Sequence, residues 1–210
     1  MRTLQALAAA AILLLATTEA RAGARPTKAR PLKTGETTSY GLGSDGNLQK
    51  GLSRLFTDLG NGIVRDVRTG LSWERKSDDG SIHDRDNTYT WGQTVSPYAM
   101  TGTAVQTFLA TLNRSPCFGG YCDWRIPNRR ELETLISLDA DDPATVDEFD
   151  DGCTPGCSVT VCNCTRSSTY WTSSSVWNFP DAAWVVDFNG GLAGYDFKTK
   201  SHHVRAVRGG

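Results

Sequence analysis

The 210-residue sequence has no apolar run after its first segment that approaches the roughly 20 residues needed to cross a membrane. It also has no basic excess, since 22 lysines and arginines are balanced by 23 aspartates and glutamates. Such a balance gives no reason to expect a nucleic-acid ligand. No repeat of fixed period occurs, so a repeat array is excluded as well. These absences point to one globular domain with appendages.

Catalytic motifs are missing too. The histidines are His83, in a polar loop, and the adjacent His202 and His203; neither place has a nucleophile and an orienting acid at recognisable spacing. The run from Ser173 to Ser175 lacks the glycines of the Gly-x-Ser-x-Gly elbow of hydrolases. We therefore predict no catalytic residue and a protein that is not an enzyme.

Residues 1–22 are typical of a secretory signal peptide. Arg2 precedes an apolar run from Leu4 to Ala16, and the small residues Ala20 and Ala22 fit a signal-peptidase site. The mature chain would be exported, into a periplasm or out of the cell. Residues 23–50 are rich in proline, glycine, serine and threonine, which predicts a flexible basic tether. Residues 51–210 are expected to form the folded domain.

Six cysteines, an even number in an exported chain, predict three disulfides. They are Cys117, Cys122, Cys153, Cys157, Cys162 and Cys164. We favour a pair between Cys117 and Cys122, which enclose a short Phe-Gly-Gly-Tyr loop, and leave the pairing of the other four open. A zinc site made by those four is the alternative, but structural zinc usually takes two short ligand pairs on separate arms as reduced thiolates.

Strand and helix patterns follow one another in blocks, as in an α+β domain. Asn-Gly and Thr-Gly pairs punctuate residues 55–74 and predict a hairpin. An apolar stripe at helical spacing predicts a helix within residues 102–113; its members are Val105, Phe108, Leu109 and Leu112. Strand patterns return at 170–174, 183–188, 192–198 and 204–208. Within residues 183–189, alternation of apolar and more polar side chains predicts a half-buried strand.

The stretch from Cys122 to Leu132 organises the rest of the chain. Pro127 fixes its own backbone, and Asn128 with Glu131 three residues later is typical of a capping box that starts a second helix. We expect Trp124 to fill the core and Arg125, beside Asp123, to satisfy a local ion pair or backbone carbonyls. A stacking platform and an anion clamp are the alternative roles for these two side chains.

Function is expected just downstream, in the acidic and cysteine-rich segment. Calcium, bound by carboxylates, is a candidate ligand at Asp139, Asp141, Asp142 and Asp147. The segment fails the EF-hand pattern, so the alternative is a solvated acidic loop. Trp177, Asn178 and Phe179 lie in a predicted loop, where exposed aromatic rings would stack on sugars; burial in the core is the alternative.

Several spaced motifs, taken together in one order, resemble the family named for the C-terminal domain of the Legionella collagen-like adhesin. The resemblance covers residues 55–208. The motifs are Gly62 to Asp66, Thr69 to Trp73, Thr90 and Trp91, Phe108 to Asn113, Gly119 to Asn128, Glu131 and Leu132, Tyr170 to Ser174 and Val204 to Arg208. The residues expected to define the fold are Trp73, Trp91, Asp123, Trp124, Arg125, Pro127, Asn128, Glu131 and Trp171.

The resemblance implies a C-type-lectin-like α+β fold: a mostly antiparallel sheet whose first and last strands pair, two flanking helices and a long disulfide-bonded loop region. It also implies a binding role, because the namesake domain is an adhesin for sulfated polysaccharides. We expect a glycan or anionic surface polysaccharide as partner. An envelope assembly protein that binds another protein is the first alternative. The second is an oxidase related to formylglycine-generating enzymes, with Cys162 and Cys164 as its reactive pair.

Overall fold

The computed structural model describes residues 30–210, so the predicted signal peptide lies outside the described residues. The strands are β1 (Phe56–Asp58), β2 (Ile63–Asp66), β3 (Ser72–Glu74), β4 (Tyr89–Thr90), β5 (Thr169–Val176), β6 (Phe179–Asp187), β7 (Leu192–Phe197), β8 (Ser201–His202) and β9 (Val207–Arg208). The helical segments are α1 (Asp45–Leu48), η1 (Ala104–Leu109), α2 (Ala110–Leu112), η2 (Phe118–Gly120), α3 (Arg129–Glu133) and η3 (Asp147–Phe149).

The first sheet has the order β1-β2-β3-β9, with every neighbouring pair antiparallel. The predicted hairpin is confirmed as β1 and β2, joined through Gly60 and Gly62, which both have positive φ. Gly62 is also in a crowded place, because a Cβ there would lie 2.9 Å from Cζ of Phe118. The closing strand β9 pairs with β3 and not with the first strand, β1.

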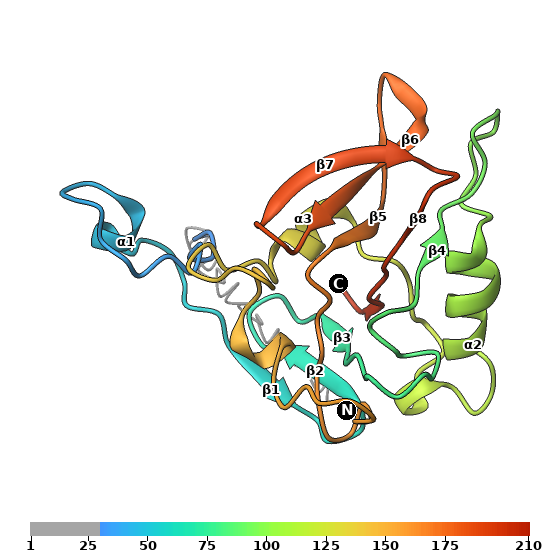
Figure 1. Cartoon of the computed structure of the whole chain (residues 1–210), viewed down its shortest axis with the longest axis horizontal. Helices are drawn as coiled ribbons and strands as arrows, with labels where there is room; N and C mark the ends of the chain where they lie inside the picture. Colours follow the sequence, from blue (N-terminus) through green and yellow to red (C-terminus); the bar gives the residue numbers. More distant parts are fainter. Residues whose placement is uncertain (1–29) are drawn as a thin grey trace, which may run out of the picture.

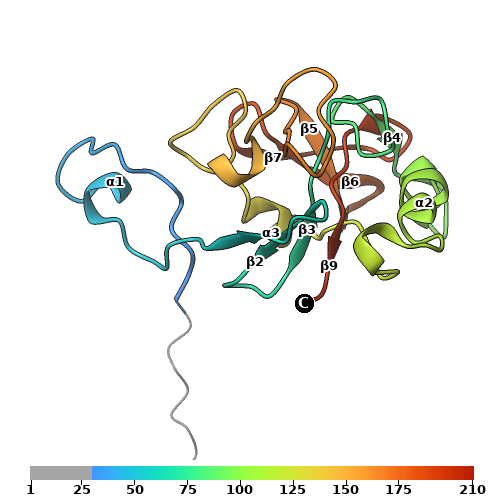
Figure 2. The same ribbon diagram turned by 90° about the horizontal axis from the view of Figure 1, so that it is seen from below.

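A second sheet, of order β5-β6-β7, lies beside the first in Figures 1 and 2. Its central strand β6 is buried on both faces at Val185 and Val186, which are 5% and 0% exposed. The prediction of a half-buried strand was therefore wrong at this position. The reason is that the sheet is covered on both sides, so Val185 joins the core cluster around Trp171 and Val186 joins the cluster around Tyr170.

Two helical segments flank the sheets, as predicted. The first comprises η1, a stretch of π-helix, and α2, and it buries Phe108 and Leu112. The second is α3, whose capping box is confirmed: the Asn128 side chain accepts from the N–H of Glu131, and the Glu131 carboxylate accepts from the N–H of Asn128. The regular helix ends at Glu133, and single turns carry the chain to Ile136.

The core consists of two apolar clusters between the sheets and helices. Trp91, Trp124 and Trp171 belong to one, and Trp73 belongs to the other, and none of these four residues is more than 4% exposed. Trp124 fills the core as expected, and its indole N–H donates to the carbonyl of Phe118. The described chain is thus a mixed α+β domain with mostly antiparallel sheets, and the lectin-like topology stays a prediction.

Residues 30–54 form an arm that projects from one side of the domain, opposite α2 (Figures 1 and 2). The arm closes on itself where Lys33 N–H donates to the carbonyl of Leu52. Its base is tied to the domain, because Leu138 N–H donates to the carbonyl of Thr34. The part of the predicted tether that the structure describes therefore has local structure, with the single turn α1 near its tip.

Candidate functional site

Aromatic side chains gather on the surface at the end of the β5-β6-β7 sheet. We define this aromatic patch as Trp177, Phe179, Tyr195 and Phe197. Trp177, in the turn between β5 and β6, is 96% exposed, and the other three are about half exposed. Figure 1 shows this hairpin projecting beyond the body of the domain. Large aromatic surfaces left in water at one place mark an interaction site more often than scattered apolar residues do.

Strand register places Tyr195 and Phe197 of the patch on one face of the sheet. Tyr195 of β7 is opposite Trp184 of β6, and Phe197 is opposite Ala182, so these side chains share one side of the pleat. The rings of Phe179 and Tyr195 are nearly parallel, with an interplanar angle of 9° and centroids 6.0 Å apart. A shallow pocket of about 320 Å³ opens here, lined by Phe179, Ala182, Tyr195, Asp196 and Phe197.

The patch is supported from beneath by Trp184, which is partly buried. The Trp184 ring meets Tyr195 edge to face at 6.1 Å, and the guanidinium of Arg129 lies 4.0 Å above the Trp184 ring. Arg129 is held in turn by Glu133, with 2.7 Å between Nε and Oε1. This ordered layer fixes Tyr195, so the aromatic surface is organised before any ligand arrives.

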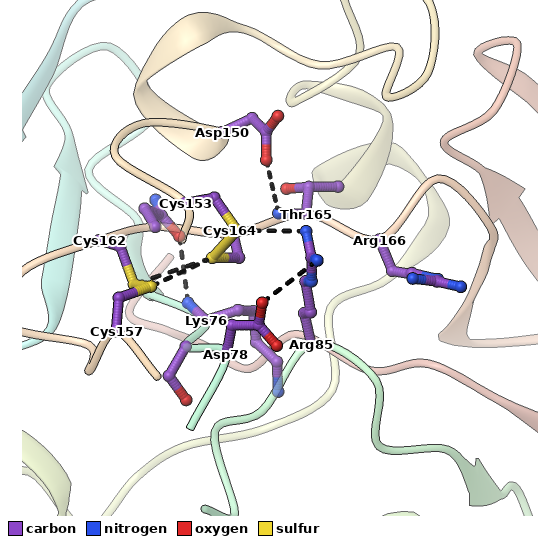
Figure 3. Close-up of a disulfide and its surroundings, with 12 residues drawn as sticks. Lys76, Asp78, Arg85, Asp150, Cys153, Cys157, Cys162, Cys164, Thr165 and Arg166 are labelled. Carbon is purple, nitrogen blue, oxygen red and sulfur yellow. Dashed lines mark hydrogen bonds and ion pairs between the residues drawn. A yellow bond between two sulfur atoms is a disulfide. The ribbon is translucent and has the colours of Figure 1, made fainter. Parts of the chain in front are cut away.

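The four-cysteine segment is closed by two disulfides, Cys153 with Cys164 and Cys157 with Cys162, while Cys117 pairs with Cys122 as favoured from the sequence. Figure 3 shows the first two bonds side by side, with Cys157 and Cys164 sulfurs 3.7 Å apart. Cys162 and Cys164 are therefore not paired with each other, and no cysteine among the described residues is free. This removes the geometric basis of the oxidase reading.

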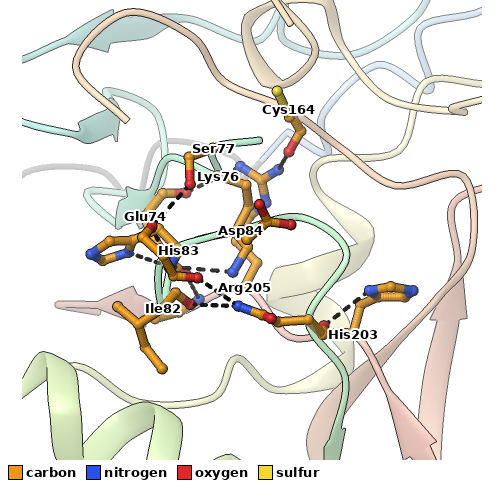
Figure 4. A network of polar contacts seen from close by, with 12 residues as sticks. Glu74, Lys76, Ser77, Ile82, His83, Asp84, Cys164, His203 and Arg205 are labelled. Atoms are coloured by element: carbon orange, nitrogen blue, oxygen red, sulfur yellow. Dashed lines mark hydrogen bonds and ion pairs between the residues drawn. The ribbon is translucent and has the colours of Figure 1, made fainter. Parts of the chain in front are cut away.

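A buried polar network joins β3, the cysteine segment and the C-terminal strand (Figure 4). Glu74 is fully buried; its Oε1 lies 2.7 Å from His83 Nδ1 and 3.4 Å from Lys76 Nζ. Burial alone would raise the pKa of Glu74, but the charge of Lys76 and the hydrogen bond from His83 outweigh it, so the pKa is lowered. Burial lowers the pKa of Lys76.

Arg205 completes this network and is 1% exposed. Its guanidinium donates to the carbonyl of Glu74, the amide oxygen of Asn163, the carbonyl of Cys164 and the hydroxyl of Thr165, at 2.8 to 3.1 Å. All of these partners belong to the protein interior, and the network touches none of the aromatic patch residues. We therefore infer that the network stabilises the fold.

The carboxylates predicted to bind calcium do not come together. No three of Asp139, Asp141, Asp142 and Asp147 lie close enough to share an ion within residues 30–210. Asp139 instead accepts a hydrogen bond from the hydroxyl of Thr37 in the N-terminal arm, and Asp147 begins η3. The acidic group that does converge in the described chain is Asp78, Asp84 and Asp86. Arg85 pairs with Asp78 at 3.2 Å, and Asp84 accepts backbone N–H groups, so local partners already balance that group.

The basic cluster of the central stretch is paired with acids. Arg125 makes two bonds of 2.8 Å to Glu131, and Arg130 lies 3.2 Å from Glu133. Asp123 pairs with Arg208, which holds the pKa of Asp123 below its usual value. Arg125 thus satisfies a local ion pair, as expected, but with the capping residue Glu131 and not with Asp123. Because Arg125 is paired with Glu131, its guanidinium does not offer the free positive charge that an anion clamp would need.

A hydroxyl, imidazole and carboxylate also line up in the second sheet region. His202 Nδ1 lies 2.5 Å from the Thr169 hydroxyl, and its Nε2 lies 2.9 Å from Asp196. The chain of contacts resembles the order of a catalytic triad, but neither Thr169 nor His202 lines the pocket at the aromatic patch. The contacts instead tie β7 and β8 to the start of β5.

The family model of the Lcl C-terminal domain matches residues 62–208. The chain belongs to the Lcl C-terminal domain family. The match begins at Gly62, seven residues after the start of the resemblance predicted from the motifs, and ends at the same residue. No curated protein sequence matches this member of the family.

The Lcl C-terminal domain match is consistent with an adhesin-associated, disulfide-bonded module, and no helix of the described residues is long and apolar enough to cross a membrane. Of the predicted ligand residues, Trp177 and Phe179 lie in the aromatic patch with Asn178 between them. Sequence reasoning missed Tyr195 and Phe197. Their two-residue spacing within a predicted strand signalled a shared face, but only the register with β6 puts that face beside Phe179.

Proposed function

We propose that this domain is an exported, non-catalytic adhesion module that binds carbohydrate through the aromatic patch. The observation that carries the proposal is the pocket lined by the half-exposed Phe179, Tyr195 and Phe197, together with the exposed Trp177 two residues before Phe179. Flat aromatic rings present a negative face to the polarised C–H groups of a sugar ring, while hydroxyls at the edge of the site make hydrogen bonds. Membership in the Lcl C-terminal domain family supports a binding role.

The arrangement suits repeated, modest contacts with a polymer. The pocket is shallow and open, and Trp177 is exposed in the turn that precedes the pocket residue Phe179, so we expect a chain of sugars to contact the pocket and the indole together. A surface adhesin gains strength by presenting many such sites at once, because linked contacts raise the effective concentration of each. The proposal therefore requires neither a deep cleft nor a reactive group.

Binding of the purified protein to an array of oligosaccharides, followed by titration with tryptophan fluorescence, tests the proposal. We expect Trp177→Ala and Phe197→Ala each to weaken binding by about fivefold, since each truncation removes an exposed aromatic contact worth about 1 kcal/mol. Val161→Ser is the matched control, because Val161 is 70% exposed in the cysteine segment. Equal loss in the control, or full binding by both patch variants, would rule out the aromatic patch as the site.

A second candidate function is docking to another protein of the envelope, and one observation favours it. The tip of the projecting arm carries Leu42 and Tyr40, which are 100% and 80% exposed. Apolar residues on a projecting loop are typical of segments that insert into a partner. Binding to isolated envelope protein that Leu42→Ser abolishes and Trp177→Ala leaves unchanged would favour this function over carbohydrate binding.

A further inference from the structure

Resting on the carbohydrate-binding role proposed above, we infer that the aromatic patch takes an uncharged carbohydrate and rejects sulfated polymers. The family resemblance pointed to sulfated polysaccharide, so this inference concerns the chemistry of this chain's own residues. It depends on which charges border the pocket and on what each of them already contacts.

The pocket lining contains no basic residue. Three of its five residues are the aromatic side chains of Phe179, Tyr195 and Phe197, and a fourth is Ala182. The remaining one, Asp196, is acidic; its carboxylate is bound to His202 Nε2 at 2.9 Å and to the N–H of Phe197 at 2.7 Å. A sulfate group brought here would lose water and gain no cation in return, which is unfavourable.

Three basic residues on the surrounding elements, Arg129, Lys198 and Lys200, contact other groups and do not line the pocket. Arg129 lies over Trp184 and is paired with Glu133. Lys198 is fully buried, with Nζ 3.0 Å from the carbonyl of Tyr98 and 4.0 Å from the centroid of the Trp91 ring. Lys200 is exposed in the turn after β7, where its N–H donates to the carbonyl of Phe197, and it is absent from the lining.

Neutral polar groups at the patch suit sugar hydroxyls. The Tyr195 side chain is 56% exposed, and Asn178 is exposed in the turn between Trp177 and Phe179. A phenol and a carboxamide each donate and accept hydrogen bonds without charge. Stacking on aromatic rings with such groups at the edge selects for shape and hydroxyl pattern, and salt screens it weakly because no ion pair takes part.

The test compares uncharged and sulfated oligosaccharides of equal length against the intact protein, at low salt and at about 0.5 M salt. We expect the uncharged ligands to bind at least about tenfold more tightly than the sulfated ones, with affinity changing less than about twofold between the two salt concentrations. Tyr195→Phe removes only the hydroxyl and should weaken binding without changing the stacked ring. Lys200→Ala should leave binding to the uncharged ligands unchanged.

Three results would overturn the inference. Sulfated ligands that bind more tightly, with affinity that falls steeply in salt and is lost in Lys200→Ala, would show that a cation outside the lining selects the ligand. Self-association in sedimentation experiments that Phe197→Ser abolishes would show that a second copy of the chain covers the patch. Absence of binding to every saccharide would reject the carbohydrate function itself, which is distinguishable from a preference for sulfated ligands.

Discussion

Replacement of Arg205 is the most direct test of what holds this domain together. The guanidinium is fully buried and donates to four acceptors: the carbonyls of Glu74 and Cys164, the amide of Asn163 and the hydroxyl of Thr165. It also lies 5.0 Å from the centroid of the Phe149 ring. Arg205→Met keeps an unbranched side chain of comparable length but removes every donor. The carbonyls of Glu74 and Cys164 would lose these donors, Asn163 Oδ1 would keep only the N–H of Lys76, and the buried carboxylate of Glu74 would lose a nearby cation.

The expected loss is large. A hydrogen bond to a charged group contributes about 1.5 to 3 kcal/mol, and removing one partner of a buried ionic network costs about 3 to 5 kcal/mol. Because the contacts are coupled and water partly replaces them, we expect a decrease in the free energy of unfolding of about 4 kcal/mol. Arg205→Lys keeps the charge but cannot reach several acceptors at once, so we expect it to recover less than half of this loss.

Urea denaturation followed by tryptophan fluorescence measures the effect. With a slope of about 2 kcal/mol per molar urea, the midpoint of Arg205→Met should fall by about 2 M. Arg130→Met is the control, because the Arg130 side chain is 87% exposed and its pair with Glu133 should contribute less than about 1 kcal/mol. A decrease below about 1 kcal/mol for Arg205→Met, or full stability in Arg205→Lys, would refute the assignment of Arg205 as the centre of the network.

Three further predictions concern a disulfide and the buried side chains of Glu74 and His203. Replacing Cys153 and Cys164 by serine should lower the free energy of unfolding by about 3 kcal/mol, because the bond closes a loop with a sequence separation of 11; urea titration with and without reductant checks this. The pKa of Glu74 is lowered in the fold, so its stabilising contribution is present above a pH of about 4.3 and is lost as pH falls through the folded pKa; Glu74→Gln should flatten the acid limb of the stability curve. Burial lowers the pKa of His203, so stability should also decrease as pH falls below about 6.5, and a His203→Gln variant that keeps the full decrease would contradict this.

The secondary structure that local chemistry dictates was predictable. Asn128 and Glu131 determine the start of α3 because both halves of a capping box lie within four residues of sequence. Short turns did the same for the first hairpin, where glycines adopt positive φ. Burial on both faces of β6 was not predictable, since the two core clusters that Val185 and Val186 join also draw on distant segments, including Ile63 and Trp73. The apolar pattern along a strand describes that strand alone, and it does not show which other segments cover its two faces.

The candidate site also contains some residues that the sequence predicted and others that it did not. Trp177 and Phe179 were predicted because they are adjacent to a turn and to Asn178, whereas Tyr195 and Phe197 depend on the β6-β7 register. The calcium prediction depended on proximity in sequence, which does not bring carboxylates together in space. Asp139 and Asp147 lie in one acidic run, but Asp139 bonds to Thr37 of the N-terminal arm and Asp147 begins η3.

The acidic and cysteine-rich segment was expected to carry the function, but the contacts of its cysteines point inward. Cys164 N–H donates to the carbonyl of Lys76, Asn163 accepts from Arg205, and Cys157, Cys162 and Cys164 are all at least nine-tenths buried. The cysteine segment is thus bound to the residues just after β3 and just before β9. These contacts stiffen that part of the fold. The β5-β6 hairpin has the opposite properties, because its tip has an exposed indole and few constraints beyond its own strands. We therefore expect substitutions in the β5-β6 hairpin to change ligand binding with little effect on the free energy of unfolding. Substitutions in the cysteine segment should mainly lower the free energy of unfolding.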